Sequence, residues 1–167
     1  MLKRGYVEKT METFGLNVRS SARANLSRRN ASGRLSSSID FDLEVFPNSF
    51  AFEMSMENYG EYLDKGVSGV KRKFNTPYSY KDKMPPTSAF DKWSIRRGLA
   101  GRNEKGQFLS RENLKFALAR SKYMKGQEPT HFFSDAVDKH YRELPDDLIE
   151  AYGLDVEELM RIELDAK

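Results

Sequence analysis

Residues 39–45 read IDFDLEV, and residues 50–56 read FAFEMSM. Apolar side chains occupy every second position in both stretches, a pattern that is typical of strands with one buried and one solvated face. Pro47-Asn48-Ser49 lies between them and is rich in turn-forming residues. The sequence therefore predicts a β-hairpin. Its solvated face is acidic on the first strand, where it carries Asp40, Asp42 and Glu44.

A long amphipathic helix is predicted before the hairpin, over residues 6–29. Its apolar residues recur at spacings of three and four, which places them on one stripe of a helix. They are Val7, Met11, Phe14, Val18, Ala22 and Leu26. A helix and a sheet that each have one apolar side bury those sides against each other. We therefore expect an α+β fold, with a long N-terminal helix packed on a small antiparallel sheet.

Further helices are predicted downstream of the hairpin. A short helix or turn covers 58–66, and a helix at about 87–97 follows Pro85-Pro86. The next, at 111–124, has Ser110 as its N-cap. Its expected inner face holds Leu114, Ala117 and Leu118. Thr130 is the expected cap of a helix that carries Phe132 and Phe133, and the acidic tail is expected to be helical in two pieces broken near Gly153.

The domain organisation follows from these elements and from the length of 167 residues, which favours one domain with appendages. We predict an α+β domain over residues 1–142 that contains a basic insertion at about 70–125. An acidic helical extension follows at 143–167. Because no run of about 18 apolar residues is present, no membrane span is expected. The N-terminus also lacks the apolar core of a signal peptide, which predicts a protein made and used on the cytoplasmic side.

Charge is distributed in blocks of alternating sign. Residues 37–64 carry seven acids and no base, residues 65–125 have a net charge of +12, and residues 143–167 have a net charge of −7. Such blocks suit a chain that pairs with copies of itself or with a charged partner. We expect the acidic strand face and the acidic tail of one copy to meet the basic block of an adjacent subunit. The alternative is that these blocks are solvated faces of separate elements.

The sequence offers little for catalysis. It has no cysteine, which excludes disulfides and thiolate chemistry, and it contains no nucleotide-binding glycine motif and no nucleophile elbow. The two histidines, His131 and His140, lack the spacing of a metal site. Asp146 and Asp147 are adjacent, so on a helix they point in different directions. We therefore predict a protein that is not an enzyme, with no catalytic residue, cofactor, metal or small-molecule substrate.

One basic and aromatic stretch is the best candidate for contact with nucleic acid. Lysine and arginine neutralise phosphates, and aromatic rings such as those of Tyr78 and Tyr80 can stack on bases. The alternative is a solvated loop whose aromatic rings pack on the body of the protein. The candidate cations of this stretch and of the helix that follows are Lys71, Arg72, Lys73, Lys81, Lys83, Arg96 and Arg97.

Three segments together resemble the tail-completion, or neck, proteins of tailed bacteriophages. Residues 32–39 (SGRLSSSI) resemble that family's passage from the first helix to the first strand. Residues 59–66 (YGEYLDKG) resemble its tyrosine-acid-glycine segment, and residues 127–136 (QEPTHFFSDA) are similar to its proline-phenylalanine-alanine segment. The motif residues are Tyr59, Tyr62, Gly66, Pro129, Phe132 and Phe133. The chain departs from the family pattern at Asp64-Lys65 and Val67, in its basic insertion and in its acidic extension.

The resemblance implies a structural virion protein of the head–tail junction, assembled in the host cytoplasm. Such a protein forms a homo-oligomeric ring, of about six or twelve copies. Its partners would be other neck, connector and tail proteins, with possible non-specific contact to the genomic DNA in the channel. Two other classes stay open: a DNA-binding accessory protein without sequence specificity, and a monomeric module that binds a host protein. Affinity for DNA that falls steeply with salt would favour the first, and a stable monomer would favour the second.

Overall fold

The computed structural model of the chain describes residues 5–27, 32–46 and 49–165. It comprises two compact units. Unit 1 contains Met1–Glu57 and Phe132–Lys167, and unit 2 contains Asn58–His131. The chain therefore leaves unit 1 after Glu57 and returns to it at Phe132, so that unit 2 is a single insertion in the sequence of unit 1.

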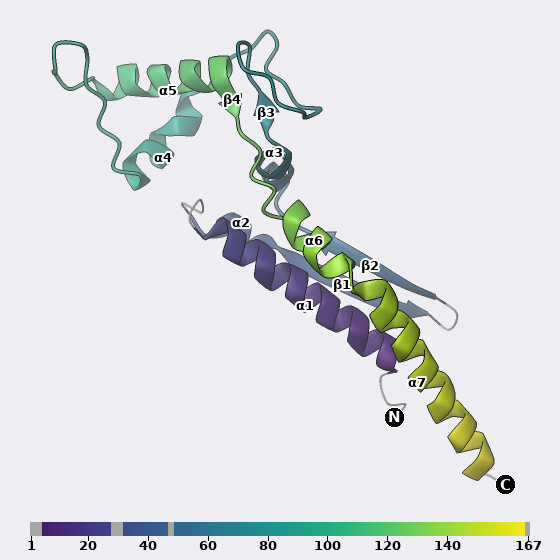
Figure 1. Cartoon of the computed structure of the whole chain (residues 1–167). Coiled ribbons are helices and arrows are strands. Elements are labelled where there is room, and N and C mark those ends of the chain that lie inside the picture. Colours follow the sequence, from purple (N-terminus) through teal and green to yellow (C-terminus); the bar gives the residue numbers. More distant parts are fainter. Residues whose placement is uncertain (1–4, 28–31, 47–48, 166–167) are drawn as a thin grey trace. The chain divides into compact units, whose positions relative to one another are not determined.

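Unit 1 is built from helices on a hairpin. Figure 1 shows α1 alongside α6 and α7, with the hairpin strands next to them. The strands are antiparallel and pair Asp40 with Ser55 and Val45 with Phe50, so the predicted hairpin and the α+β class are confirmed. Pro47 and Asn48, and the predicted helix end at Arg28 and Arg29, lie outside the described residues. The elements are α1 (Tyr6–Leu26), α2 (Arg34–Ser38), β1 (Asp40–Phe46), β2 (Ser49–Ser55), α6 (Ser134–Tyr141) and α7 (Leu144–Asp165).

The predicted stripe of α1 forms much of the core of unit 1. Met11, Val18, Ala22 and Leu26 are buried. Gly15 lies on the same side, and a Cβ atom there would come within 2.7 Å of the Phe41 ring. The glycine that weakens the helix in isolation therefore allows β1 to approach α1 closely.

Aromatic rings join the hairpin to α1. Phe14 lies 5.4 Å from Phe52, which in turn stacks on Phe41 at 5.7 Å between ring centroids. Towards the tip of the hairpin the same face opens to solvent, since Val45 is 55% exposed and Phe50 is also exposed. The apolar face that the alternation predicts is therefore covered at its base and open at its tip.

The acidic tail forms one continuous helix, α7, so the expected break near Gly153 is wrong. A glycine within a helix costs about 1 kcal/mol relative to alanine, and packing on α1 offsets that cost. Leu144 and Ala151 are buried before the glycine. After it, the Asp155 carboxylate accepts hydrogen bonds from the backbone N–H groups of Tyr6 (2.6 Å) and Val7 (3.1 Å). The helix is thus tied to α1 on both sides of Gly153.

Asp155 also caps the N-terminal end of α1. Gly5 stands at the N-cap position and has no side chain to satisfy the first free N–H groups of the helix. We expect Asp155→Ala to lower the free energy of unfolding by about 1 kcal/mol, measured by urea denaturation. Asp155→Asn, which keeps an acceptor but loses the charge, should cost less. Equal stability of wild type and the alanine variant would show that this carboxylate does not cap α1.

Unit 2 is a smaller assembly around α5. Its N-cap is Ser110, whose side chain accepts from the Asn113 N–H as predicted. Asp91 ties α4 to this helix through Arg111 at 2.9 Å and Lys115 at 3.6 Å. The expected inner position of Ala117 is wrong: it is exposed, and Ala119 is buried instead. The elements are α3 (Tyr59–Lys65), β3 (Val67–Ser68), η1 (Thr87–Phe90), α4 (Asp91–Arg96), α5 (Arg111–Lys125) and β4 (Gly126–Gln127).

Candidate interaction surfaces

Two of the segments that carry the family resemblance meet within unit 2. The last turn of α3 leaves backbone carbonyls without helical partners, and residues after β4 satisfy them. Thr130 donates from its N–H and its hydroxyl to the Leu63 carbonyl, at 3.2 and 2.9 Å. His131 donates its N–H to the Asp64 carbonyl at 3.1 Å. Thr130 therefore caps the C-terminal end of α3, and its predicted role as the N-cap of the following helix is wrong.

The predicted motif residues Gly66 and Pro129 lie directly against each other. Gly66 has φ of +76°, and a Cβ atom there would stand 2.6 Å from the Pro129 nitrogen and 2.8 Å from the Gln127 carbonyl oxygen. Only glycine accommodates both the left-handed backbone and this contact. The glycine therefore lets the chain turn out of α3 while the segment before α6 passes next to it.

The aromatic motif residues have different environments. Tyr59 is exposed, and Tyr62 is exposed but packs on the Tyr78 ring at 4.5 Å. Phe132 belongs to unit 1, where it is only 2% exposed and its carbonyl accepts a hydrogen bond from Asn25 (3.0 Å). Phe133 is half-buried, with its ring edge against Phe132. Phe132 is thus the core anchor of the segment, whereas the two tyrosines remain on the surface of unit 2.

The candidate cations form two groups in unit 2. Lys71, Arg72 and Lys73 follow β3, and the Lys71 N–H donates to the Met124 carbonyl at the end of α5. Tyr123 donates its hydroxyl to the Lys81 carbonyl, which holds the stretch containing Lys81 and Lys83 at the same end. Arg96 is the last residue of α4 and Arg97 follows it, and α4 lies towards the other end of α5 in Figure 1. The structure therefore does not bring the seven cations together on one site.

Most aromatic rings near these cations already have partners within unit 2. Tyr80 packs on Tyr123 at 6.2 Å, and burial raises the pKa of the Tyr80 hydroxyl. The Arg72 guanidinium lies 4.9 Å from the Phe74 ring and forms an ion pair with Glu128. Lys71, Lys73, Lys81 and Lys83 are exposed. This surface therefore offers lysines to an anionic partner more readily than rings for stacking on bases.

The acidic strand face is only partly available. Arg19 forms an ion pair with Asp40 at 2.7 Å, and this hydrogen bond lowers the pKa of the Asp40 carboxyl. Asp42 and Glu44 are exposed on the same face. Asp42 stands opposite Glu53 in the hairpin, and like charges placed directly opposite each other destabilise a sheet. An approaching cation would relieve that repulsion.

The two histidines lie in different units. His140 lies 2.8 Å from the Ser21 hydroxyl and so links α6 to α1, and His131 ends unit 2. Among the residues that the structure describes, no group of three or more histidine and acidic side chains is placed to hold a metal ion. Within the same residues, no helix combines the length and apolar character needed to cross a bilayer.

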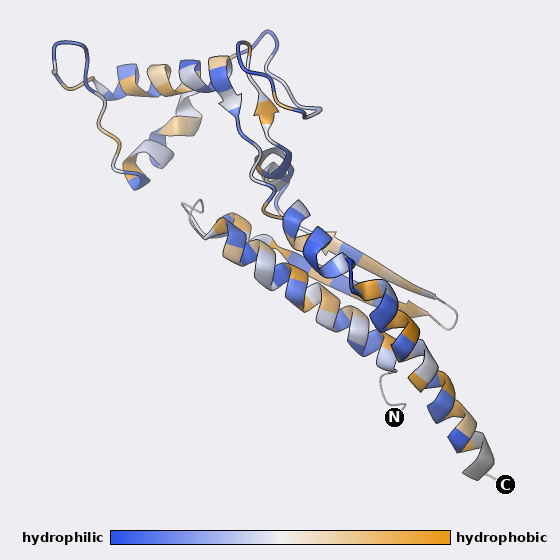
Figure 2. Cartoon of the chain, in the orientation of Figure 1, coloured by the Kyte–Doolittle hydropathy of each residue, from blue (hydrophilic) through white to orange (hydrophobic). Residues whose placement is uncertain are grey.

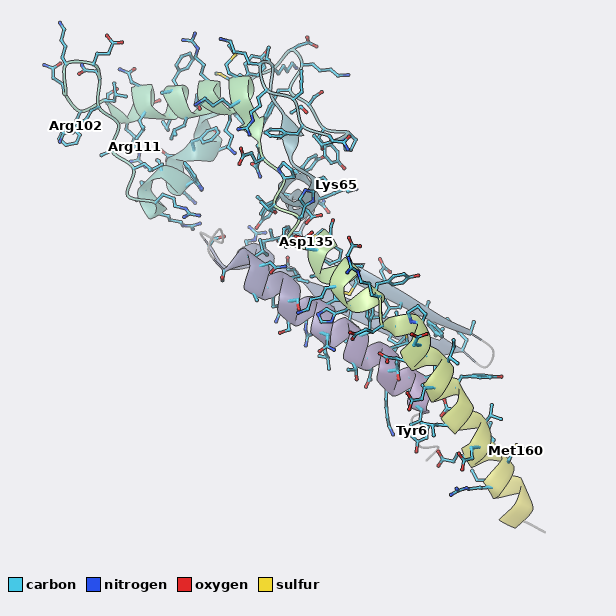
Figure 3. All side chains as sticks on the ribbon, in the orientation of Figure 1. Tyr6, Lys65, Arg102, Arg111, Asp135 and Met160 are labelled. Carbon is cyan, nitrogen blue, oxygen red and sulfur yellow. The ribbon has the colours of Figure 1, made fainter. Side chains whose placement is uncertain are left out.

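Two exposed apolar surfaces stand out in the structure beside the predicted cations and the acidic strand face. We define the α7 stripe as Ile149, Tyr152, Val156, Leu159 and Met160, all exposed. We define the α5 groove as the open, mainly apolar hollow lined by Lys71, Phe116, Ala117, Arg120, Ser121, Met124 and Lys125. Figure 2 shows apolar residues on α7 interrupted by polar ones, and in Figure 3 the labelled Met160 projects from α7 into solvent. Helical spacing of apolar residues within 149–160 is visible in the sequence. The packing of α7 on α1 was needed to show which side of α7 stays open.

Comparison with known proteins leaves the chain without an assigned family. No family model, curated protein or solved structure matches it.

Proposed function

We propose that this protein is a structural component of the head–tail junction of a tailed bacteriophage. In this role it is a tail-completion or neck ring protein that joins the head connector to the tail and surrounds the DNA channel. It acts by binding other proteins and catalyses no reaction. The observation that best supports a binding role is the amount of apolar surface left open on so small a chain, at the hairpin tip, on α7 and on α5. Contiguous exposed apolar surface marks sites of protein association.

The phage assignment draws on the family resemblance and on two features that agree with it. The long helix α1 packs on a small antiparallel hairpin, as the resemblance implies. The segments 59–66 and 127–136 carry two of the resembling motifs, and Gly66 of the first lies against Pro129 of the second. Ring formation would then use one surface patch of each copy against a different patch of the next, which produces closed cyclic symmetry when the rotation closes. The exposed lysines of unit 2 would face either the DNA channel or a neighbouring ring.

Imaging of purified virions tests this proposal. We expect the chain to be present in particles as a ring of about six or twelve copies at the head–tail junction. Its identity in the density would be checked with an epitope tag on the same chain. Absence from particles, or scattered single copies on the capsid, would rule out the neck role.

A second candidate is a DNA-binding accessory protein without sequence specificity. The exposed side chains of Lys71, Lys73, Lys81 and Lys83 favour it, because lysines that neutralise phosphates release counterions. Duplex affinity measured at several salt concentrations separates the two functions. A steep loss with salt, together with absence from virions, would support DNA binding, whereas weak binding at all salt concentrations would remove this candidate.

A further inference from the structure

The α7 stripe is a second apolar side of a helix whose first apolar side is already buried on α1. Ile149 is 72% exposed and Tyr152 is 67% exposed. They begin a series at 149, 152, 156 and 160, which is the spacing of a helix face that packs on a partner. The series adjoins an apolar hollow that Ile149 and Tyr152 share with Val7 and Phe50. Nothing within unit 1 covers this side of the described part of α7.

Charge limits what can cover the stripe. Asp146, Glu150 and Glu157 recur along α7 at spacings of four and seven, so they lie on one side of the helix parallel to the stripe, and Arg161 pairs with Glu157 at 2.7 Å. Residues 143–167 have a net charge of −7. Two α7 helices packed against each other would bring these carboxylates together, which opposes association. A suitable partner surface is therefore apolar in its centre and basic at its rim.

The α5 groove has these properties. Its apolar lining comes mainly from Phe116, which is 52% exposed, and from Ala117 and Met124. Exposed cations stand around it: Arg120 and Lys125 from α5, and Lys71 from the turn after β3. The groove has a volume of about 480 Å³ and is largely open to solvent. An amphipathic helix laid in an apolar groove is a common mode of recognition between proteins.

The two surfaces also match in length. A helix rises about 1.5 Å per residue, so the stripe from 149 to 160 is about 16 Å long and the groove from 116 to 125 is about 13 Å long. We propose that the α7 stripe of one copy binds in the α5 groove of the next copy of this chain. The contact rests on the self-assembly in the proposed function and gives that assembly a defined interface.

This contact makes the assembly directional. Each copy places its own stripe in the groove of one neighbour and binds the stripe of the other neighbour in its own groove. The interface is therefore heterologous, and copies add head to tail until the ring closes. Apolar burial supplies affinity, while the carboxylates and the cations of the groove rim orient the approach. High salt should therefore weaken association without altering the fold.

Two variants of the full-length chain test the contact, each altered on one surface only. The stripe variant carries Ile149→Ser and Tyr152→Ser, and the groove variant carries Phe116→Ser and Arg120→Glu. These four side chains are exposed, so melting curves should match wild type. Sedimentation equilibrium should show concentration-dependent oligomers for wild type. Each variant alone should associate more weakly by about tenfold or more.

Mixing gives the decisive result. The stripe variant keeps an intact groove and the groove variant keeps an intact stripe, so an equimolar mixture should form 1:1 dimers that grow no further. Leu16→Ser, a matched change at an exposed apolar residue of α1 outside both surfaces, should leave wild-type association unchanged.

Other outcomes separate this contact from the proposed function. Two monomeric variants that fail to pair on mixing would overturn the head-to-tail contact. Variants that assemble like wild type would also overturn it, while a ring at the head–tail junction of virions would still support the neck role. A wild-type chain that stays monomeric at every concentration would overturn the contact between copies. Virion imaging would then be the remaining test of the neck role.

Discussion

Replacing Phe132 by alanine should lower the free energy of unfolding of unit 1 by about 3–5 kcal/mol. The ring is 2% exposed and is the largest of the fully buried side chains. Its removal leaves a cavity between the start of α6 and the C-terminal part of α1, where Asn25 holds the Phe132 carbonyl. Because small domains are stable by only about 5–15 kcal/mol, this loss is a large part of the total. Urea unfolding followed by circular dichroism measures it.

Phe133→Ala provides the control at the adjacent position. Phe133 is half-buried, so the same truncation should remove less contact and cost less. Phe108→Ala removes an exposed ring from unit 2 and should leave unit 1 unchanged. If Phe132→Ala and Phe133→Ala destabilise the protein equally, Phe132 is not the anchor of the segment that returns the chain to unit 1.

Gly66→Ala is expected to disrupt the fold of unit 2. Two effects add at this position: φ is +76°, and the new Cβ atom would stand 2.6 Å from the Pro129 nitrogen. Backbone rather than a flexible side chain blocks the methyl group, so the segment after β4 must move away from α3. The move would break the hydrogen bonds from Thr130 and His131 to the last turn of α3. We expect a loss of about 3 kcal/mol or more, with faster amide exchange at Thr130 and His131.

Gly106→Ala separates the two effects. Gly106 belongs to the same unit and has φ of +77°, but nothing lies within 4 Å of the position its Cβ atom would take. It should therefore show only the backbone penalty, about 1 kcal/mol. If both alanine variants lose the same stability, backbone conformation alone explains Gly66 and its contact with Pro129 is unimportant.

Local elements were largely predictable from the sequence because side-chain periodicity reflects local geometry. Alternation over residues 39–45 and 50–56 identified the hairpin, and spacings of three and four identified α1. Ser110 was recognised as a cap because its hydrogen bond is made three residues along the same chain. Each of these features depends on neighbours in sequence, so composition and order were sufficient to establish the α+β class.

Features that depend on distant partners were decided by the tertiary structure. Gly153 stays within a helix because α1 holds α7 on both sides of it, through Ala151 and Asp155. Thr130 caps α3 rather than its own following helix because the chain brings it to the Leu63 carbonyl.

The candidate interaction surfaces show the same division. The blocks of charge, the cations of unit 2 and the acidic strand face could be identified from residue types alone. Only the tertiary structure shows that Arg19 lies next to Asp40, so that this carboxylate already has a partner. The apolar residues of α7 and α5 were also visible as helical patterns. A pattern shows that a side is apolar, but only packing shows which apolar side is covered, because burial is a property of the partner surface as much as of the helix.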